Sequence, residues 1–371
     1  PEGTPPACSS AAALLDSPFE QPAGRLLKIP PTSFSVRHNP QRTPPVQAVR
    51  GGDFAARFVE RVGLSKTLCQ KRDDWYDSQT LSRSIRYDHM TISLSHIERV
   101  QAQWALKTGM SLERPGYVKD LADNLLLRKL NPETEAEFAK ADGSELRDSG
   151  NRPAKMRALV SSSALAVNFF DSWRDVSKGL LSNALKLPEL ITSLRFEYKC
   201  DKEKYPVGPG SPNLDLLLTL ADGQRIGIES KFVEPYRGKD YDLLPKYFPS
   251  GLGYWSNAGL LRAQGLANEI RGRWKYLDVP QLLKHMLGLR SEKPEATVQL
   301  IYVWYDTGFA DAKAHRAEVE QFSDSIAGDV VRFSAISYQE LFKSLRESSP
   351  DSFPRWAAYL SERYFPVIEA V

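Results

Sequence analysis

The chain has 371 residues, of which 42% are hydrophobic and 26% are charged, and its formal net charge at pH 7 is +3. These fractions are typical of a soluble protein of one or two domains, and they exclude a polycation that binds nucleic acid through its overall charge. No apolar run approaches the roughly 20 residues of a membrane span, so no membrane partner is expected. Cys8, Cys69 and Cys200 lie far apart without CxxC spacing, which favours a reducing cytoplasm over disulfides or a zinc site.

The first 150 residues are expected to form two regions. Residues 1–50 are rich in Pro, Ser and Ala, and their paired prolines forbid long helices, which predicts an extended arm. Residues 51–150 are expected to be mainly helical, because apolar residues recur there at helical spacing. The three segments that show this spacing contain Phe54, Phe58, Val59 and Val62, then Ile97, Val100, Trp104 and Leu106, then Val118, Leu121, Leu125 and Leu126.

Residues 151–371 alternate between helical and strand patterns, which predicts an α/β domain after a polar boundary at 132–153. The expected helices span 156–173, 176–187, 260–276, 279–289 and 338–346. The expected strands span 194–198, 214–220, 225–232, 298–305 and 330–336.

The stretch PNLDLLLTLADGQRIGIESKF contains the most informative of these elements, a predicted β-hairpin with an Ala-Asp-Gly turn. Pairing its two strands brings Asp215 near Glu229. Lys231 points the same way as Glu229, because side chains two residues apart share a face of a strand. Two carboxylates and one amine are therefore expected to converge on one face of a sheet.

This trio suits metal-assisted hydrolysis of a phosphodiester. Mg²⁺ takes hard oxygen ligands and keeps several waters, so one or two carboxylates suffice to hold it, and Mn²⁺ is a possible substitute. A neighbouring lysine can orient the attacking water or stabilise charge at phosphorus. The alternative is a surface hairpin with a weak Glu–Lys pair. The flanking apolar residues predict a buried sheet, where charges are costly unless they have a role. They are Leu216, Leu218, Ile226 and Ile228.

This motif resembles that of the PD-(D/E)XK nuclease superfamily, with Asp215 as the first aspartate and Glu229 and Lys231 as the ExK element. Asn213 departs from the pattern, because the superfamily name places an aspartate there, and Asp215 is taken as its equivalent. Three segments also resemble a bacterial group of restriction-endonuclease-like proteins, over about Met156 to Tyr305. They are SSSALAVNFF at 161–170, GIESKF at 227–232 and QLLKHMLGL at 281–289.

The resemblance implies a restriction-endonuclease-like core with a mixed central sheet flanked by helices, a bound Mg²⁺ and DNA as substrate. By analogy, the backbone carbonyl of Ser230 is a further metal ligand. A homodimer is plausible, because two active sites cut two strands most easily. Glu197, in the preceding strand, is a further candidate ligand, and a salt bridge to a neighbour is its alternative. Glu234 is expected at the rim of the site.

Candidate substrate-binding residues lie on two predicted helices. Gln281, Lys284 and His285 share a helix face after the motif, and the alternative is that Lys284 and His285 are simply exposed. Ser163 and Asn168 could line the site, although residues 161–163 could equally cap a helix. Residues 259–290 contain six Lys or Arg against two acids, which favours a phosphate-rich partner.

The sequence thus predicts a Mg²⁺-dependent DNA endonuclease, and the resemblance implies a role in restriction or phage defence. Two alternatives remain open. The protein could be a non-catalytic nucleic-acid-binding or scaffold protein that keeps a nuclease fold. It could also be a repair or recombination nuclease that acts on branched or single-stranded DNA. A function is argued from the site and not from the fold alone.

Overall fold

The computed structural model describes residues 91–141, 145–176, 178–207, 210–238, 242–248, 253–270, 272–348 and 353–366. The expected Pro-rich arm and the expected helical segment at 54–62 lie outside these ranges. All described residues belong to one compact unit. Within this part of the chain, no helix combines the length and the apolarity that crossing a bilayer requires.

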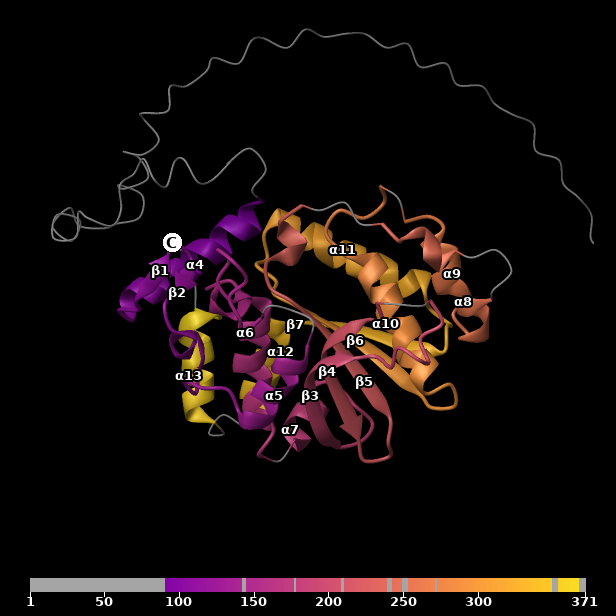
Figure 1. The fold of residues 1–371 in the computed structure, drawn as a ribbon, viewed down its shortest axis with the longest axis horizontal. Helices are drawn as coiled ribbons and strands as arrows, with labels where there is room; N and C mark the ends of the chain where they lie inside the picture. Colours follow the sequence, from indigo (N-terminus) through magenta and orange to yellow (C-terminus); the bar gives the residue numbers. More distant parts are fainter. Residues whose placement is uncertain are drawn as a thin grey trace, which may run out of the picture. The chain divides into compact units, whose positions relative to one another are not determined.

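A mixed sheet of five strands forms the centre of the unit, in the order β3-β4-β5-β6-β7 (Figure 1). The first three strands are antiparallel, and the last three are parallel. Their bounds are Ile191–Lys199 (β3), Asn213–Leu220 (β4), Arg225–Lys231 (β5), Val298–Trp304 (β6) and Val331–Ser337 (β7). All five strands were predicted from the sequence, and Gly223 forms the expected hairpin turn with φ +82°.

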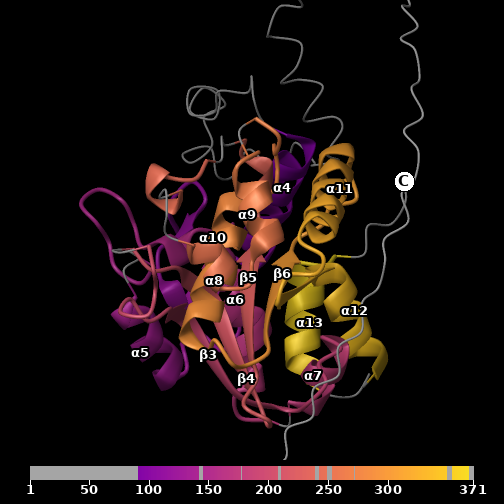
Figure 2. The ribbon, with the colours of Figure 1, turned by 90° about the vertical axis from the view of Figure 1, so that its right-hand side faces the viewer.

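Helices cover both faces of this sheet, because alternate strand residues are apolar on both sides. One face contributes Leu216, Ile228 and Ile301 to a core with α4 to α7, α12 and α13. The other face contributes Leu217, Leu300 and Trp304 to a core with α8 to α11. Figure 2 shows α8 to α10 and the α12–α13 pair on opposite sides of the strands. The predicted fold class, a mixed central sheet flanked by helices, is confirmed.

The α-helices have the following bounds: Ile92–Lys107 (α4), Pro132–Lys140 (α5), Ser162–Phe170 (α6), Gly179–Ala184 (α7), Tyr254–Asn257 (α8), Leu261–Ala267 (α9), Val279–Glu292 (α10), Ala310–Ser325 (α11), Tyr338–Ser348 (α12) and Pro354–Arg363 (α13). Short 3-10 turns span Leu121–Asn124 (η2), Lys155–Arg157 (η3), Asp171–Trp173 (η4), Glu234–Tyr236 (η5) and Pro245–Tyr247 (η6). A small hairpin joins Leu112–Arg114 (β1) to Tyr117–Val118 (β2).

The helix expected over 156–173 is wrong at its start. The carbonyls of Met156 and Ala158 accept hydrogen bonds from the Asn124 side chain, which holds this stretch out of the helix. The helix begins at Ser162 instead, and the Ser161 hydroxyl accepts a hydrogen bond from the backbone N–H of Ala164. This is the N-terminal cap that residues 161–163 suggested.

Two other helical expectations are corrected by side-chain competition for the backbone. The helix expected over 260–276 ends as α9 at Ala267, and the Glu318 carboxylate accepts three backbone N–H groups of residues 275–277. The stretch 118–126 forms β2 and η2 rather than a long helix, and Asp120 caps η2. Helices α11 and α13 were not predicted.

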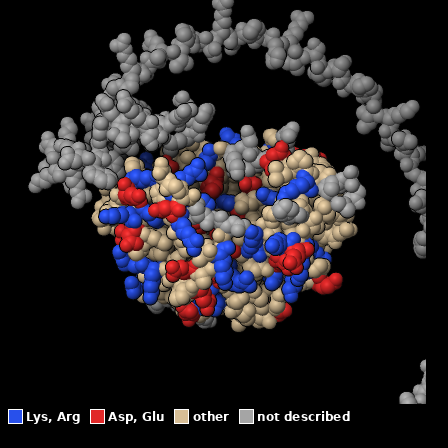
Figure 3. Space-filling view, in the orientation of Figure 1, with Lys and Arg blue, Asp and Glu red and all other residues tan. Residues whose placement is uncertain are grey.

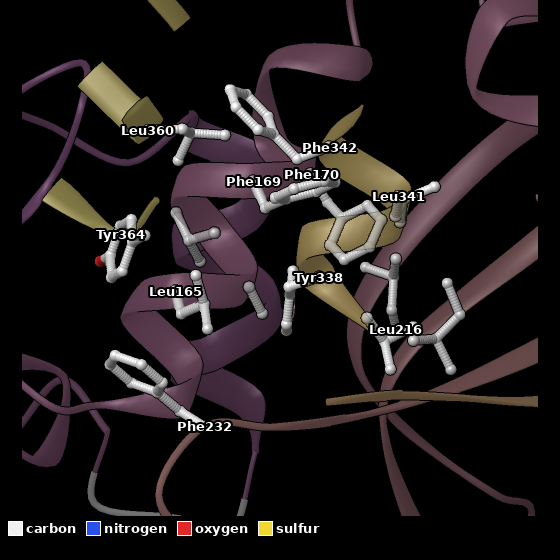
Figure 4. Packing of buried hydrophobic residues seen from close by; sticks show 14 of the residues in the cluster. Leu165, Phe169, Phe170, Leu216, Phe232, Tyr338, Leu341, Phe342, Leu360 and Tyr364 are labelled. Atoms are coloured by element: carbon white, nitrogen blue, oxygen red, sulfur yellow. The ribbon is translucent and has the colours of Figure 1, made fainter. Parts of the chain in front are cut away.

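Residues 91–141 contribute to the same core as the sheet. Phe138 of α5 stacks on Phe196 of β3 with ring centroids 5.7 Å apart, and Leu94 and Ile97 of α4 join the same cluster. Figure 4 shows the centre of this cluster, where α6 presents Leu165 and Phe169 toward Tyr338 of α12. The expected division near residue 150 therefore does not separate two hydrophobic cores among the described residues.

Two glycines let α10 approach the sheet closely. A Cβ at Gly288 of α10 would lie 2.5 Å from Pro212 Cγ and 2.8 Å from Cys200 Sγ. A Cβ at Gly227 of β5 would lie 2.8 Å from Leu289 Cδ1. Gly227 shares a strand face with Glu229, so this close contact sets the height of α10 above the acidic residues.

We expect Gly288→Ala to lower the free energy of unfolding by about 1–3 kcal/mol, because the added methyl overpacks the contact between α10 and the sheet. Urea denaturation measures the change. Gly265→Ala is the matched control, because Gly265 is also helical but has nothing within 4 Å of an added Cβ. It should be neutral or stabilise by up to about 1 kcal/mol. Equal effects of both substitutions would contradict the close-approach explanation.

Candidate active site

Asp215 and Glu229 face one another at the end of the β4–β5 ladder. The last regular pair of this ladder joins Leu216 to Ile228, so the next residue on each strand is one of the two acids. Beyond this pair the strands part, and the backbone N–H of Ser230 donates to Asp215 Oδ2 at 2.7 Å. The expected approach of Asp215 to Glu229 is thereby confirmed by the strand register.

Glu197 lies opposite Asp215 on β3, the strand that flanks β4 on the side away from β5. The residues flanking Glu197 on β3 pair with the residues flanking Asp215 on β4, namely Phe196 with Leu216 and Tyr198 with Leu214. Glu197 itself has a left-handed backbone with φ +48°, which is rare and strained for a residue with a side chain. Its carboxylate accepts a hydrogen bond from the Asn213 side-chain amide. Three acidic residues thus stand side by side on three adjacent strands.

Glu229 is fully buried and held between two basic side chains. Lys231 Nζ contacts Oε1, and His285 Nε2 lies 2.9 Å from Oε2. Neither contact has the alignment of a hydrogen bond. Burial alone would raise the pKa of Glu229, but the charges of Lys231 and His285 outweigh it and lower this pKa to about 2. Glu229 is therefore a permanent carboxylate at neutral pH.

Lys231 is held as a cation. Burial would lower its pKa, but the neighbouring carboxylates of Glu229 and Asp215 outweigh burial and raise the pKa above its ordinary value. A general base must be deprotonated at the working pH, so this environment does not suit Lys231 to that role. It suits a fixed positive charge that orients water or stabilises a phosphorus centre.

Negative charge accumulates around Asp215 and Glu197. Burial and the charge of Glu229 raise the pKa of Asp215 well above its ordinary value. Burial, together with the charges of Glu145 and Glu229, raises the pKa of Glu197 to about 7. Like charges resist joint ionisation in this way when no cation neutralises them.

Glu145 extends this acidic row, and Lys155 forms an ion pair with it. Sequence analysis missed both residues. Glu145 is buried, its Oε2 accepts from the Ser163 hydroxyl at 2.8 Å, and its Oε1 lies 2.9 Å from Lys155 Nζ. The charges of both Glu145 and Lys155 act on Glu197. No linear signal marked them, because they belong to a polar stretch that resembles a linker. Ser163 thus reaches the edge of the site through Glu145.

Two other predicted residues lie beside Asp215, Glu229 and Lys231. Ser230 points its hydroxyl to the opposite face of the sheet, where its oxygen lies 2.7 Å from Tyr338 Oη. The Glu234 carboxylate accepts the Phe232 backbone N–H at 2.8 Å, and its charge acts on Lys231. Glu234 is partly exposed and caps the turn that follows β5, and its place at the rim of a functional site stays a prediction.

The three candidates on α10 differ in exposure. Gln281 and Lys284 are partly exposed, whereas His285 is only 2% exposed and faces Glu229. The alternative of a simply exposed His285 is therefore wrong. Arg290, one of the basic residues in this segment, donates to the carbonyls of Ala258 and Ala296 and so has a structural role.

Asn168 is engaged in the core. Its side-chain oxygen accepts the Leu126 N–H at 2.7 Å, and its amide donates to the Asn124 carbonyl and to Tyr364 Oη. With a longer contact to Tyr359 Oη, four partners from the protein engage the side chain, and its exposure is 2%. These contacts fasten α6 to the segment at 124–126, and they leave no support for the substrate-binding role that was expected of Asn168.

The donor set of the site fits a hard divalent cation. Asp215 and Glu229 present carboxylate oxygens, which Mg²⁺ and Mn²⁺ prefer. Burial, together with the neighbouring carboxylates, raises the pKa values of Asp215 and Glu197, and a bound cation would relieve this cost of ionisation. Among the described residues, no group of three or more His, Cys, Asp or Glu side chains is already assembled as a metal cage. Mg²⁺ needs only one or two carboxylates, with water completing its shell.

The site is open to solvent on one side. Asp215 and Glu197 are partly exposed, and the Lys231 side chain is 13% exposed, in contrast to the buried Glu229. Figure 3 shows basic and acidic side chains interleaved on one face of the unit, around a hollow. A solvent-accessible row of charges next to a buried carboxylate is suited to a polar, charged substrate.

A family model described as restriction endonuclease associating with ARP matches residues 95–365. The match begins within α4 and ends just after α13, so it includes the sheet and every side chain of the site described above. No curated protein and no solved structure matches this chain.

Proposed function

The chain belongs to the family of restriction endonucleases associating with ARP, and from this premise we propose that it is a metal-dependent DNA endonuclease of the PD-(D/E)XK type. The observation that supports the proposal most strongly is the placement of Glu229. Its carboxylate is fully buried, stays ionised, and lies beside Asp215 and Lys231 at the end of β5. A buried ionised carboxylate is costly, which favours a functional reason for its retention.

Asp215 and Glu229 would hold Mg²⁺, with the Ser230 carbonyl as a further ligand and Glu197 as an additional carboxylate. When bound, such an ion polarises a phosphoryl oxygen and lowers the pKa of bound water. Lys231, kept protonated by its neighbours, orients the attacking water and stabilises charge on the phosphodiester. Gln281 and Lys284, partly exposed on α10, would contact backbone phosphates, which gives affinity without sequence information.

The family, the fold and the site together support DNA as the substrate, with restriction or phage defence as the role. A homodimer and a cytoplasmic location stay predictions from the sequence. The proposal is tested by incubating the protein with linear duplex, single-stranded and branched DNA in Mg²⁺, Mn²⁺ or EDTA. We expect metal-dependent cleavage of duplex DNA. Cleavage confined to branched or single-stranded DNA would favour a repair nuclease, and binding without cleavage under every condition would favour a scaffold.

The acidic row predicts a distinctive pH dependence of stability without metal. The pKa of Glu197 is about 7 in the folded protein and 4.5 in its ordinary state. Between these values the native state holds more protons than the unfolded state, so the free energy of unfolding falls as pH rises through this window. Asp215 contributes with the same sign. We expect a loss on the order of 1–3 kcal/mol from pH 5 to pH 8 in EDTA.

The measurement is urea denaturation in EDTA at several pH values, with Glu197→Gln as the comparison. Glutamine cannot ionise and can still pair with the Asn213 amide through its oxygen, so the variant should show a flatter profile and greater stability at pH 8. Identical slopes for the two proteins would contradict the assigned origin of the effect.

A further inference from the structure

We propose that His285 is a positioning residue that fixes the Glu229 carboxylate for metal binding and does not contact the substrate. This inference rests on the proposed nuclease function and deepens it. It gives His285 a different role from Gln281 and Lys284, its neighbours on α10, which are placed for phosphate contacts.

The contact itself is buried on both sides. His285 is 2% exposed and Glu229 is 0% exposed, and the imidazole Nε2 lies 2.9 Å from Glu229 Oε2. A side chain so enclosed cannot reach a phosphate at the surface without a rearrangement of α10. It can act on the chemistry only through the carboxylate that it touches.

The two oxygens of Glu229 have different neighbours. Lys231 stands at Oε1 and reaches the partly exposed side of the site, whereas His285 stands at Oε2 from the helix layer. Neither ring nitrogen of His285 has an aligned hydrogen-bond partner within the described ranges, and the 2.9 Å approach of Nε2 to Glu229 Oε2 is the close charged contact that the structure gives this ring. The imidazole therefore limits rotation of the carboxylate from the helix side, and Lys231 borders its other oxygen.

Helix α10 gives His285 a fixed position. The Asp278 side chain caps the helix by accepting the Gln281 N–H at 3.0 Å. Its buried face includes Leu282, Met286 and Leu289. Gly288 lets the helix rest against the start of β4, where a Cβ would collide with Pro212. A group that contacts a metal ligand without contacting the metal can hold that ligand in the orientation that binds the ion, and a rigid helix keeps such a group in place.

The experiment measures Mn²⁺ binding by isothermal titration calorimetry, without DNA, for the wild type, His285→Leu and His285→Gln. We expect His285→Leu to weaken Mn²⁺ binding about ten- to a hundredfold, the usual effect of losing an outer-shell partner. His285→Gln keeps a side-chain N–H near Glu229 and should restore most of the affinity. His315→Gln is the matched control, because His315 is equally buried in the same layer but bonds to Tyr302 Oη. It should leave the affinity unchanged whatever its effect on stability.

Wild-type Mn²⁺ affinity in a folded His285→Leu variant would overturn the proposal. So would a higher KM for DNA in that variant with unchanged metal affinity, because it would assign His285 to the substrate. The binding measurement is independent of turnover. A wild type that binds Mn²⁺ but cuts no DNA would refute the proposed function, while the comparison of variants would still decide the role of His285.

Discussion

Asp215→Asn is expected to reduce DNA cleavage roughly a thousandfold or more while making the metal-free protein more stable. The substitution preserves the shape of the side chain, and its amide oxygen can still accept the Ser230 N–H that now binds Oδ2. It removes a negative charge from between Glu197 and Glu229. The raised pKa values of Asp215 and Glu197 show that this charge is unfavourable in the folded state without a cation.

We expect the gain in the free energy of unfolding at pH 8 in EDTA to be about 1 kcal/mol or more. Plasmid cleavage and urea denaturation, measured on the same preparation, test the two halves of this prediction. Asp324→Asn on the exposed face of α11 is the control and should change neither quantity. A destabilised Asp215→Asn protein would mean that Asp215 is a structural residue whose charge is already compensated.

Arg363→Met is expected to produce the largest loss of stability, about 3–5 kcal/mol. Arg363 is 0% exposed, and its guanidinium donates to five acceptors from four parts of the chain. They are Gln101 Oε1, the carbonyl and Oδ1 of Asn124, the carbonyl of Leu159, and Tyr359 Oη. Removing the donors takes these partners from Gln101 Oε1, Asn124 Oδ1 and the Leu159 carbonyl, and each buried acceptor left unpaired costs about 1–3 kcal/mol.

The planar group also lies over three aromatic rings, at 4.3 Å from the centroid of Trp104, 4.6 Å from that of Tyr364 and 5.8 Å from that of Tyr359. Lysine cannot reproduce five forked donors or this stacking, so Arg363→Lys should rescue little of the loss. Thermal unfolding should show a fall in Tm on the order of 10 °C for Arg363→Met. Arg355→Met, at an exposed position of the same helix, is the control. A fall of equal size in both variants would contradict the assigned role of Arg363.

The strands and the central trio could be predicted because their signals are local. Alternation of apolar residues fixed the faces of β4 and β5, and the Gly223 turn fixed their register, so Asp215, Glu229 and Lys231 were assigned from 21 contiguous letters. A slip of one residue would have turned every side chain to the other face. Glu197 also followed from its position in the preceding strand.

The remaining features depend on contacts between distant segments, which no local pattern encodes. Glu145 precedes Glu197 by more than 50 residues in the sequence, yet its charge acts on Glu197 in the folded protein. His285 was predicted as a site residue, but its burial against Glu229 depends on how closely Gly227 and Gly288 let α10 pack. The late start of the helix expected over 156–173 arises from Asn124, and the early end of the helix expected over 260–276 coincides with the contacts of Glu318. Both side chains bind backbone groups far away in sequence.

The most direct test of the proposed nuclease is the conversion of supercoiled plasmid by wild type and by Lys231→Ala, each with Mg²⁺ and with EDTA. Lys343→Ala, on the exposed side of α12, controls for the loss of a lysine. The account predicts nicking or linearisation by the wild type and by Lys343→Ala in Mg²⁺ only, and none by Lys231→Ala. Equal cleavage by all three proteins, or a folded wild type that binds DNA and is inert with every divalent metal, would contradict it.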